Sequence, residues 1–314
     1  VENGVLSIVA GYNALGRLYR GIICNNLRQY VMLGDAGAMT NNIIGDEDDR
    51  WVFTEDNPPR ELNSAADLAA SSRVLKGFND TLSIQALNIS KELFHNTSDE
   101  GRAQEAKLRA ATELYLATGN NEYKDYLISK VDYITKNIKR VGWFIGRADV
   151  EMKDTEFSAA VQKALLTYRD ELEVEKTETP YGIPYRPRIW GAGWDIQAFG
   201  FKHYFLVKAY PQVFSADIVF NSLNFILGCH PGKNTSSFAS GVGTKSATVA
   251  YGVNRADWSY IPGGVISGTA LIRPDFPELL DFPYLWQQTE YVMGGGSSNY
   301  MFLVLAAIEL SKGE

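Results

Sequence analysis

Apolar and small residues recur at helical spacing along most of this 314-residue chain. A clear example is the stripe that ends at Gly119, formed by Ala103, Ala106, Ala110, Leu114 and Ala117. Side chains at this spacing share one face of an α-helix, and a glycine commonly follows the last turn. No alternating pattern longer than a few residues indicates a β-strand. The sequence therefore predicts an all-α protein.

The pattern predicts about nine helices, over residues 5–22, 64–76, 80–94, 103–117, 123–138, 154–169, 194–209, 216–227 and 298–312. Long helices in antiparallel pairs indicate a helical toroid or solenoid, and the lack of a fixed repeat argues against a short regular solenoid. Residues 32–62, 175–193 and 228–296 interrupt the pattern. Since no linker or shift in composition separates these parts, we expect one domain over residues 1–314, with its long loops on one face.

The charge balance excludes several classes of function. Thirty Lys and Arg residues against 37 Asp and Glu residues give a net charge of −7, and no basic run appears. This argues against binding to nucleic acid or to anionic lipid. No apolar run reaches the ~18–20 residues that span a membrane. The chain begins without the features of a signal peptide and as if inside a helix, so we expect that residue 1 is not the natural start.

The cysteines and histidines give no metal motif. Cys24 and Cys229 lie far apart, so a disulfide and two separately buried thiols both stay open. Three histidines are scattered, and none forms a paired motif for zinc. We expect structural roles for His95 and His203. His230 stands in GCHPGKN at the start of the longest irregular stretch, and it is a candidate to contact a ligand.

One carboxylate stands out from the 37. Glu290 is flanked by Trp286, Tyr291 and Met293, with no neighbouring cation. Apolar surroundings disfavour the charged form and raise the pKa of a carboxyl group, which keeps a proton available for general acid catalysis. A buried glutamate that caps the last helix explains the same pattern. The 38 aromatic residues likewise fit either a well-filled core or a surface that stacks on sugar rings.

Several segments, taken in order, carry a resemblance to a known family. The region that contains FILGCHPGKNTSSFASGVGTKS, YGVNRADWSYIPGGVISG and WQQTEYVMGGGSSNYMFLVLAA resembles the C-terminal motif region of glycoside hydrolase family 9, which contains cellulases and related β-glucan-active enzymes. Upstream, NPPRELNSAADLAASSRVL and KLRAATELYLATGNNEYKDYL resemble helices of that family, and RIWGAGW resembles its WG loop. The resemblance covers most of the chain.

The resemblance implies an (α/α)6 barrel of twelve helices and inverting hydrolysis of a glycosidic bond. In that chemistry one carboxylic acid protonates the leaving oxygen, and one carboxylate activates water on the opposite face. Glu290 matches the acid of the family, and Arg255 in YGVNRADW matches an arginine that holds the sugar. The usual pair of histidines before that arginine is absent, and Tyr251 and Asn254 stand there instead.

Further positions are implied as substrate contacts. Trp286 occupies a segment that departs from the Asp-rich turn of the family, so it is expected to shape the cleft differently. Trp194, the last residue of RIWGAGW, and His230 complete the predicted set.

The catalytic base has no clear match. The family places it in a DAGD-type motif, and the similar string here, Gly34–Ala38, carries Asp35 but lacks the second aspartate. It also stands too close to the Ala-rich helix, so we assign Asp35 to a different loop. Nine helices in place of twelve agree with this. We therefore expect a toroid that is incomplete at its N-terminus, with the base in a separate N-terminal segment of the same enzyme.

The sequence thus predicts a secreted, periplasmic or cell-surface glycoside hydrolase that acts on a β-linked glucan or related polysaccharide, by endo or exo action. The chemistry requires no cofactor. The acidic stretch Gly45–Asp49 is a candidate for a structural Ca²⁺, although a solvated acidic loop explains it equally well. Two alternatives stay open. One is a non-catalytic glycan-binding protein with the same toroid, and the other is a polysaccharide lyase of the same fold.

Overall fold

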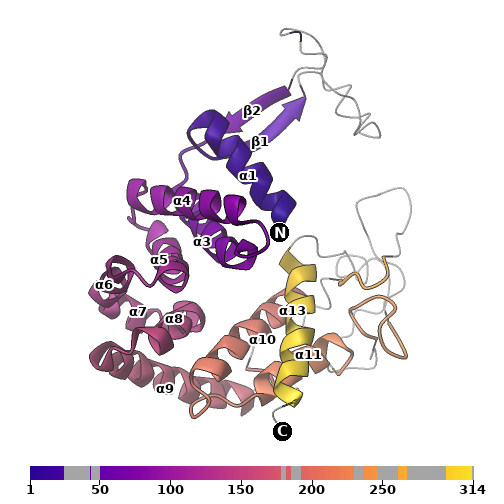
Figure 1. Ribbon diagram of the computed structural model, residues 1–314. Coiled ribbons are helices and arrows are strands. Elements are labelled where there is room, and N and C mark those ends of the chain that lie inside the picture. Colours follow the sequence, from indigo (N-terminus) through magenta and orange to yellow (C-terminus); the bar gives the residue numbers. More distant parts are fainter. Residues whose placement is uncertain are drawn as a thin grey trace. The chain divides into compact units, whose positions relative to one another are not determined.

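The structure is a computed structural model of the whole chain, and it describes residues 1–24, 43, 50–177, 182–184, 192–229, 236–246, 261–266 and 295–312. Contacts divide the chain into two compact units, Val1–Lys130 (unit 1) and Val131–Glu314 (unit 2). Eleven helices and two strands lie in the described residues (Figure 1). Helices dominate both units, as the periodicity predicts. A single domain over residues 1–314 stays a prediction.

Unit 1 holds one strand pair and five helices, in the order α1 (Glu2–Leu15), β1 (Tyr19–Cys24), β2 (Arg50–Thr54), α3 (Pro58–Leu75), α4 (Asp80–Asn96), α5 (Ala103–Thr118) and α6 (Asn121–Ser129). Helix α3 packs against both α4 and α5. The faces that meet are rich in alanine, and Ala65, Ala69, Ala86, Ala110 and Ala111 are fully buried. Small side chains let the three helices approach one another closely.

Asparagine side chains cap the starts of α3, α4 and α6 in unit 1. The Asn57 side chain accepts a hydrogen bond from the Arg60 amide at 3.2 Å, and Pro58 occupies the first helical position of α3. Asn79 accepts from the Leu82 amide at 3.1 Å at the start of α4. These caps satisfy amides that have no partner within the helix. The predicted start of α3 at residue 64 is therefore wrong, because Asn57 and not Asn63 is the cap.

Strands β1 and β2 form an antiparallel pair in which Tyr19 is opposite Thr54 and Cys24 is opposite Arg50. The pair lies beside α1 (Figure 1). It corrects two expectations, because no strand was predicted and residues 19–22 were assigned to the first helix. Helix α1 ends before Gly16, whose φ of 66° is a left-handed conformation that favours glycine. Each strand is short, and its partner is distant in sequence, so local periodicity could not reveal the pairing.

Unit 2 contains six of the described helices, which are α7 (Val131–Lys136), α8 (Ile138–Met152), α9 (Thr155–Thr177), α10 (Ala192–Ala209), α11 (Asp217–Ile226) and α13 (Gly295–Ser311). Helices α10, α11 and α13 contact one another and lie side by side (Figure 1). At Gly200 in α10, a Cβ atom would stand 2.6 Å from Ser222 Cβ of α11 and 2.9 Å from Leu303 Cδ1 of α13. This glycine therefore permits the close approach of all three helices.

Helix α8 was not predicted, and the helix expected over 123–138 is divided into α6 and α7. The sequence of α8 contains Gly142 and Gly146, which lower helix propensity. Both glycines have a packing role, because a Cβ at Gly142 would stand 3.1 Å from Leu165 and one at Gly146 would stand 2.8 Å from the Tyr210 ring. Tertiary packing thus outweighs the local preference in this helix.

Candidate active site

Most residues predicted to form the site lie outside the described part of the chain. They are Glu290, Arg255, Trp286, His230 and Tyr251, together with Asn254 and the rejected base candidate Asp35. Their positions stay predictions. The structure does describe the segments of unit 2 that precede and follow most of the stretches in which these residues occur. We call these described segments the framework.

Backbone hydrogen bonds join two described segments of the long irregular region to each other and to α11. The Phe238 amide donates to the Ile226 carbonyl at the end of α11 at 2.8 Å, and the Ile266 amide donates to the Phe238 carbonyl at 3.0 Å. The Ser240 amide donates to the Gly264 carbonyl at 2.9 Å. Residues 236–246 and 261–266 are therefore held together, which brings the two ends of the intervening stretch to one place.

A hydrophobic cluster lies at the same place. Its buried members are Ile183, Ile196, Phe225, Ile226, Phe238, Ala239, Val265 and Ile266, and the half-buried Phe199, Val242 and Tyr300 pack against it. Ile196 and Phe199 belong to α10, and Tyr300 belongs to α13. The stretches 230–235, 247–260 and 267–294 each begin or end within a few residues of a cluster member. The cluster is therefore the base to which the predicted loops of the site attach.

Trp194 is the predicted site residue that the structure describes. It lies in the first turn of α10, two residues before Ile196 of the cluster, and 39% of it is exposed. An exposed indole offers a large apolar surface at low entropic cost, as stacking on a sugar ring requires. Its contact with substrate stays a prediction.

Gln197 is a polar group that the sequence analysis did not consider. It lies one turn after Trp194 in α10 and is fully buried, and neither its Oε1 nor its Nε2 has a hydrogen-bond partner among the described residues. A buried amide without partners is costly, so such groups commonly bind an ordered water or a ligand. The available signal was a single amide in the apolar run Ile196–Phe201, which helical periodicity alone does not single out.

His203 of α10 is held as a neutral ring. It is almost fully buried and packs against the rings of Phe199 and Phe214, and its Nδ1 lies 2.8 Å from the Phe199 carbonyl oxygen. Burial lowers the pKa of His203 to about 4, because desolvation disfavours the imidazolium. This environment is that of a core residue, as expected from the sequence. His95, in contrast, is half-exposed and bonds to Glu122 at 2.6 Å.

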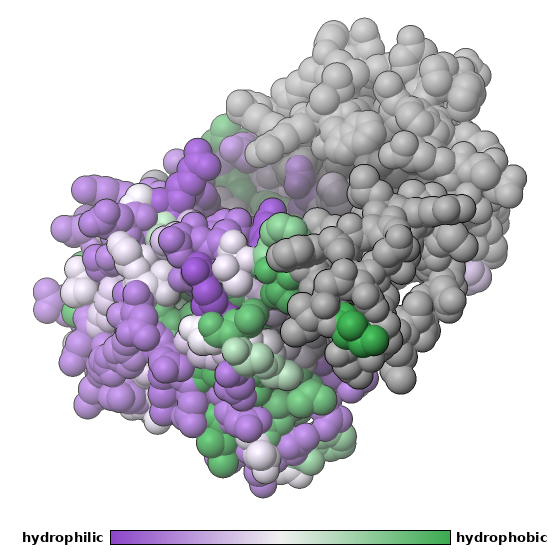
Figure 2. Space-filling view, turned by 90° about the horizontal axis from the view of Figure 1, so that it is seen from above, coloured by the Kyte–Doolittle hydropathy of each residue, from purple (hydrophilic) through white to green (hydrophobic). Residues whose placement is uncertain are grey.

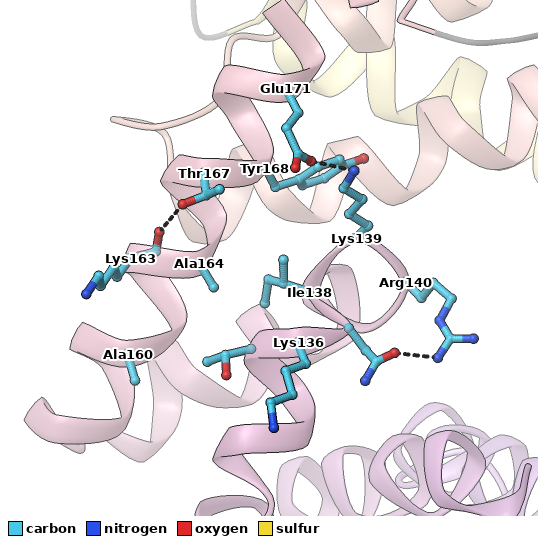
Figure 3. A pocket seen from close by; sticks show the side chains of 12 residues that line it. Lys136, Ile138, Lys139, Arg140, Ala160, Lys163, Ala164, Thr167, Tyr168 and Glu171 are labelled. Atoms are coloured by element: carbon cyan, nitrogen blue, oxygen red, sulfur yellow. Dashed lines mark hydrogen bonds and ion pairs between the residues drawn. The ribbon is translucent and has the colours of Figure 1, made fainter. Parts of the chain in front are cut away.

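A pocket of about 680 Å³ lies between α9 and the junction of α7 and α8. Figure 3 shows Ile138 and Ala164 in its middle, whereas the ammonium groups of Lys136 and Lys163 point away from Ile138. Its one carboxylate, Glu171, forms an ion pair with Lys139. Inverting hydrolysis requires two carboxyl groups ~6.5–9.5 Å apart. This pocket lacks such a pair, so it is not the candidate catalytic centre.

The described residues bear on the predictions for metal ligands and for the two cysteines. These residues contain no group of three His, Cys, Asp or Glu side chains that could hold a metal ion, and the acidic stretch Gly45–Asp49 lies outside them. Cys229 carries a free, exposed thiol. The expectation of a buried thiol is therefore wrong for this cysteine, and a disulfide with Cys24 of unit 1 stays open. None of the described helices is both long and apolar enough to cross a membrane.

Comparison with solved structures defines the class of fold. The chain is similar to the cellulase Cel9M of C. cellulolyticum, with 18% identity and a TM-score of 0.59 over 81% of this chain and 64% of that one. It is also similar to a single mutant of a thermostable endoglucanase from Alicyclobacillus acidocaldarius, with 15% identity and a TM-score of 0.69. That match covers 97% of this chain and 63% of that one. An endoglucanase from the termite Nasutitermes takasagoensis matches with 17% identity and a TM-score of 0.61, over 84% of this chain and 70% of that one. The fold is therefore mostly helical and of the (α/α)6 class, with the strand pair β1–β2 as its one described sheet.

The profile of glycosyl hydrolase family 9 matches residues 28–254, which is well over half of the chain. The chain belongs to glycosyl hydrolase family 9. No curated protein matches the sequence. The chain spans less than two thirds of the length of the first two solved relatives described above. Glu290, Arg255 and Trp286 follow the matched range, whereas Trp194, His230 and Tyr251 lie within it.

Proposed function

We propose that this chain is part of an inverting glycoside hydrolase that cleaves a β-linked glucan or a related polysaccharide. The observation that carries the proposal is the family 9 match over residues 28–254. Further support comes from the cellulase of C. cellulolyticum, which was crystallised with cellobiose, and from a relative crystallised with a cellobiose-like isofagomine.

In the proposed mechanism Glu290 is the general acid. Its aromatic neighbours in the sequence favour the protonated carboxyl group, which donates its proton to the glycosidic oxygen as the bond to the anomeric carbon breaks. An aspartate from a segment outside residues 1–314 removes a proton from the water that attacks the opposite face. Inversion at the anomeric carbon follows from this geometry, and no cofactor takes part.

Substrate binding is assigned to the loops that attach to the cluster of unit 2. We assign Arg255 to the substrate because the planar fork of N–H donors of arginine suits paired sugar hydroxyls, and we assign further polar contacts to Tyr251 and His230. Trp286 and the exposed Trp194 stack on sugar rings. Because polymeric glycans do not enter cells, we propose that the protein acts in the periplasm, at the cell surface or outside the cell.

Replacement of Glu290, the proposed acid, tests the mechanism. The experiment uses the polypeptide that also includes the segment with the catalytic base. We expect Glu290→Gln to lower the release of reducing sugar from a β-glucan by ~10²–10⁴, which is the usual contribution of general acid catalysis. The loss should be much smaller on a dinitrophenyl β-cellobioside, whose leaving group needs no proton. NMR of the first product should show the α-anomer.

Glu173→Gln is the matched control, because Glu173 is an exposed carboxylate that pairs with Lys176 on α9. It should leave turnover unchanged. If Glu290→Gln kept near-full activity on polysaccharide, the assignment of the acid would be wrong. If the wild-type protein bound cello-oligosaccharides but released no reducing sugar, the chain would be a glycan-binding protein and not an enzyme.

Arg255→Lys tests the substrate contact separately. We expect weaker binding of cellotetraose in calorimetry, because lysine cannot reproduce the paired donors of arginine. The melting temperature should change little. An unchanged affinity would assign Arg255 to a structural role and leave the acid assignment intact.

A further inference from the structure

Gln197 of α10 stands out among the polar groups of the described residues. Most such groups lie at the surface, where hydrophilic residues cover much of the view (Figure 2). The Gln197 side chain, in contrast, is fully buried, and neither its donor nor its acceptor has a partner among the described residues. An unpaired buried amide costs stability, and an apolar side chain of the same size would serve the fold better. A contribution to stability therefore does not account for this amide.

Helices α10 and α13 pack side by side in unit 2 (Figure 1). They approach closely at Gly200, because a Cβ there would stand 2.9 Å from Leu303 Cδ1. One turn later on α10, the Tyr204 hydroxyl donates to Glu309 at 2.6 Å. An advance along α10 from Gly200 to Tyr204 thus accompanies an advance along α13 from Leu303 to Glu309. The two helices therefore run in the same direction, and their N-terminal ends lie at the same end of the pair.

Gln197 lies on the side of α10 that faces the N-terminal end of α13. It precedes Tyr204 by seven residues, which is about two turns, so the two side chains share one side of the helix. The Tyr204 ring meets that of Phe302 with centres 5.5 Å apart, and two turns before Phe302 helix α13 begins at Gly295. The first N–H groups of a helix have no partner within it. The buried amide therefore lies beside main-chain groups that need one.

The start of α13 is also the point at which the chain arrives from the proposed acid. Only four residues separate Glu290 from Gly295. A general acid must stand within hydrogen-bond reach of the atom that it protonates, and a displacement of about 1 Å can cost ~10² in rate. Whatever fixes the start of α13 therefore limits how far Glu290 can move.

We propose that Gln197 is a positioning residue for Glu290, because its amide holds the start of α13 through a buried water. Buried waters commonly bond polar groups that otherwise lack partners, and no described atom bonds this amide directly. The role rests on the proposed function, since it requires Glu290 to be the acid. The contact between Gln197 and α13 does not require hydrolysis.

Gln197→Met tests the role in the same polypeptide as Glu290→Gln. Methionine is similar in length to glutamine and lacks the donor and the strong acceptor of the amide. We expect kcat on a β-glucan to fall roughly 10–100-fold with KM nearly unchanged, because the acid is displaced from the glycosidic oxygen. Hydrolysis of a dinitrophenyl β-cellobioside should fall less than about twofold, since its leaving group needs no proton. A merely structural defect would lower both rates alike.

Gln197→Glu is the conservative variant. Burial disfavours the carboxylate and raises the pKa of the new carboxyl group, whose protonated form keeps a donor and an acceptor. At about pH 5 the ratio of the two rates should therefore approach that of the wild type, and it should fall as the pH rises. Thr112→Val is the matched control, because it removes the other unpaired buried oxygen, which lies in α5 of unit 1. It should leave the ratio unchanged at every pH.

Amide hydrogen exchange provides a measurement that needs no activity. In Gln197→Met the first-turn amides of α13, Gly295–Ser298, should exchange roughly tenfold faster than in the wild type, because local opening becomes easier. Unchanged exchange, an equal loss of both rates, or a variant that is more stable and fully active would overturn the proposal. A wild type that releases no reducing sugar, with faster exchange in the variant, would refute the proposed function and retain the contact with α13. An active wild type that loses turnover in Glu290→Gln but not in Gln197→Met would do the reverse.

Discussion

Unit 1 and unit 2 fill their interiors with different side chains. Helices α3, α4 and α5 of unit 1 meet through alanines, whereas α8 to α13 of unit 2 meet through rings such as Phe144, Tyr168, His203 and Phe225. Alanine interfaces bring backbones close together, so polar side chains at their edges reach across to the neighbouring helix. Ring interfaces need space, which glycines provide where two helices cross. Substitutions in the two units should therefore lower the free energy of unfolding for different physical reasons.

The largest expected effect is at an ion pair of unit 1. Arg73 on α3 donates to the Glu113 carboxylate at 2.5 Å and to the Glu113 carbonyl oxygen at 2.9 Å, and Glu113 is only 5% exposed. Arg73→Met removes the guanidinium that pairs with this buried carboxylate. We expect a loss of roughly 3 kcal/mol in the free energy of unfolding, measured by urea denaturation.

Arg109→Met is the control for this prediction. Arg109 pairs with Asp67 at 2.7 Å between the same two helices, but the Asp67 side chain is 62% exposed. Water can therefore solvate Asp67 after the change, and the loss should be about 1 kcal/mol or less. Equal losses in the two variants would show that burial of the carboxylate does not determine how much these ion pairs contribute to the free energy of unfolding.

In unit 2 the corresponding buried ionisable group is His203. Burial lowers its pKa from 6.5 to about 4, so the folded protein binds this proton less readily than the unfolded chain. The stabilisation is complete above pH 6.5, falls as the pH decreases from 6.5 to 4, and is lost below pH 4. The linkage amounts to about 3 kcal/mol over this window.

Comparison of unfolding free energies between pH 7 and pH 4 checks this prediction. His203→Phe cannot take up a proton, so its stability should fall less steeply with decreasing pH than that of the wild type. The slope is the informative quantity, because the substitution can change stability at pH 7 for packing reasons. Parallel curves for the two proteins would mean that His203 titrates normally in the folded state.

A smaller effect is expected where glycine permits ring-rich helices to cross. Gly200→Ala places a Cβ atom 2.6 Å from Ser222 Cβ and 2.9 Å from Leu303 Cδ1, so α10 must move away from its neighbours. Overpacking of this kind costs about 1–3 kcal/mol, which exceeds the gain in helix propensity. Gly4→Ala in α1 is the control, because no atom lies within 4 Å of its new Cβ. That variant should be more stable by up to about 1 kcal/mol, and thermal melts should therefore shift in opposite directions.

The same contrast explains what the sequence could predict. In α5 the alanine spacing and the glycine that follows the helix both lie within one short segment. The sequence therefore predicts the bounds of this helix closely. The sequence does not predict α8, because the two glycines in this helix make room for Leu165 and Tyr210, which are distant in sequence. Strands β1 and β2 were missed for a related reason. Their pairing joins residues about 30 positions apart, which no local pattern records.

The candidate site shows the same limit. Motif order identified the family, and the profile match confirmed it. Periodicity could not show that the segments 236–246 and 261–266 pair with each other above the Ile196 and Phe225 cluster, because backbone hydrogen bonds make that contact. Nor could it show that Gln197 is buried without a partner among the described residues. Both facts depend on which distant residues meet.

The smallest predicted effect concerns helix caps, which differ between helices within both units. Asn57, Asn79 and Asn120 cap helices of unit 1 through their side chains, and Asp154 accepts a hydrogen bond from the Phe157 amide at 3.1 Å at the start of α9. Helices α8 and α11 of unit 2 begin without such a bond. Asn57→Ala removes the acceptor of the Arg60 amide and should cost about 1 kcal/mol, and Asn57→Ser should restore most of it. Ala216→Asn before α11 should bring no gain, because φ of −65° and ψ of −19° are helical values and not those of a cap. A clear stabilisation by Ala216→Asn in chemical denaturation would mean that α11 lacks only the capping side chain, and not the backbone geometry of a capped helix start.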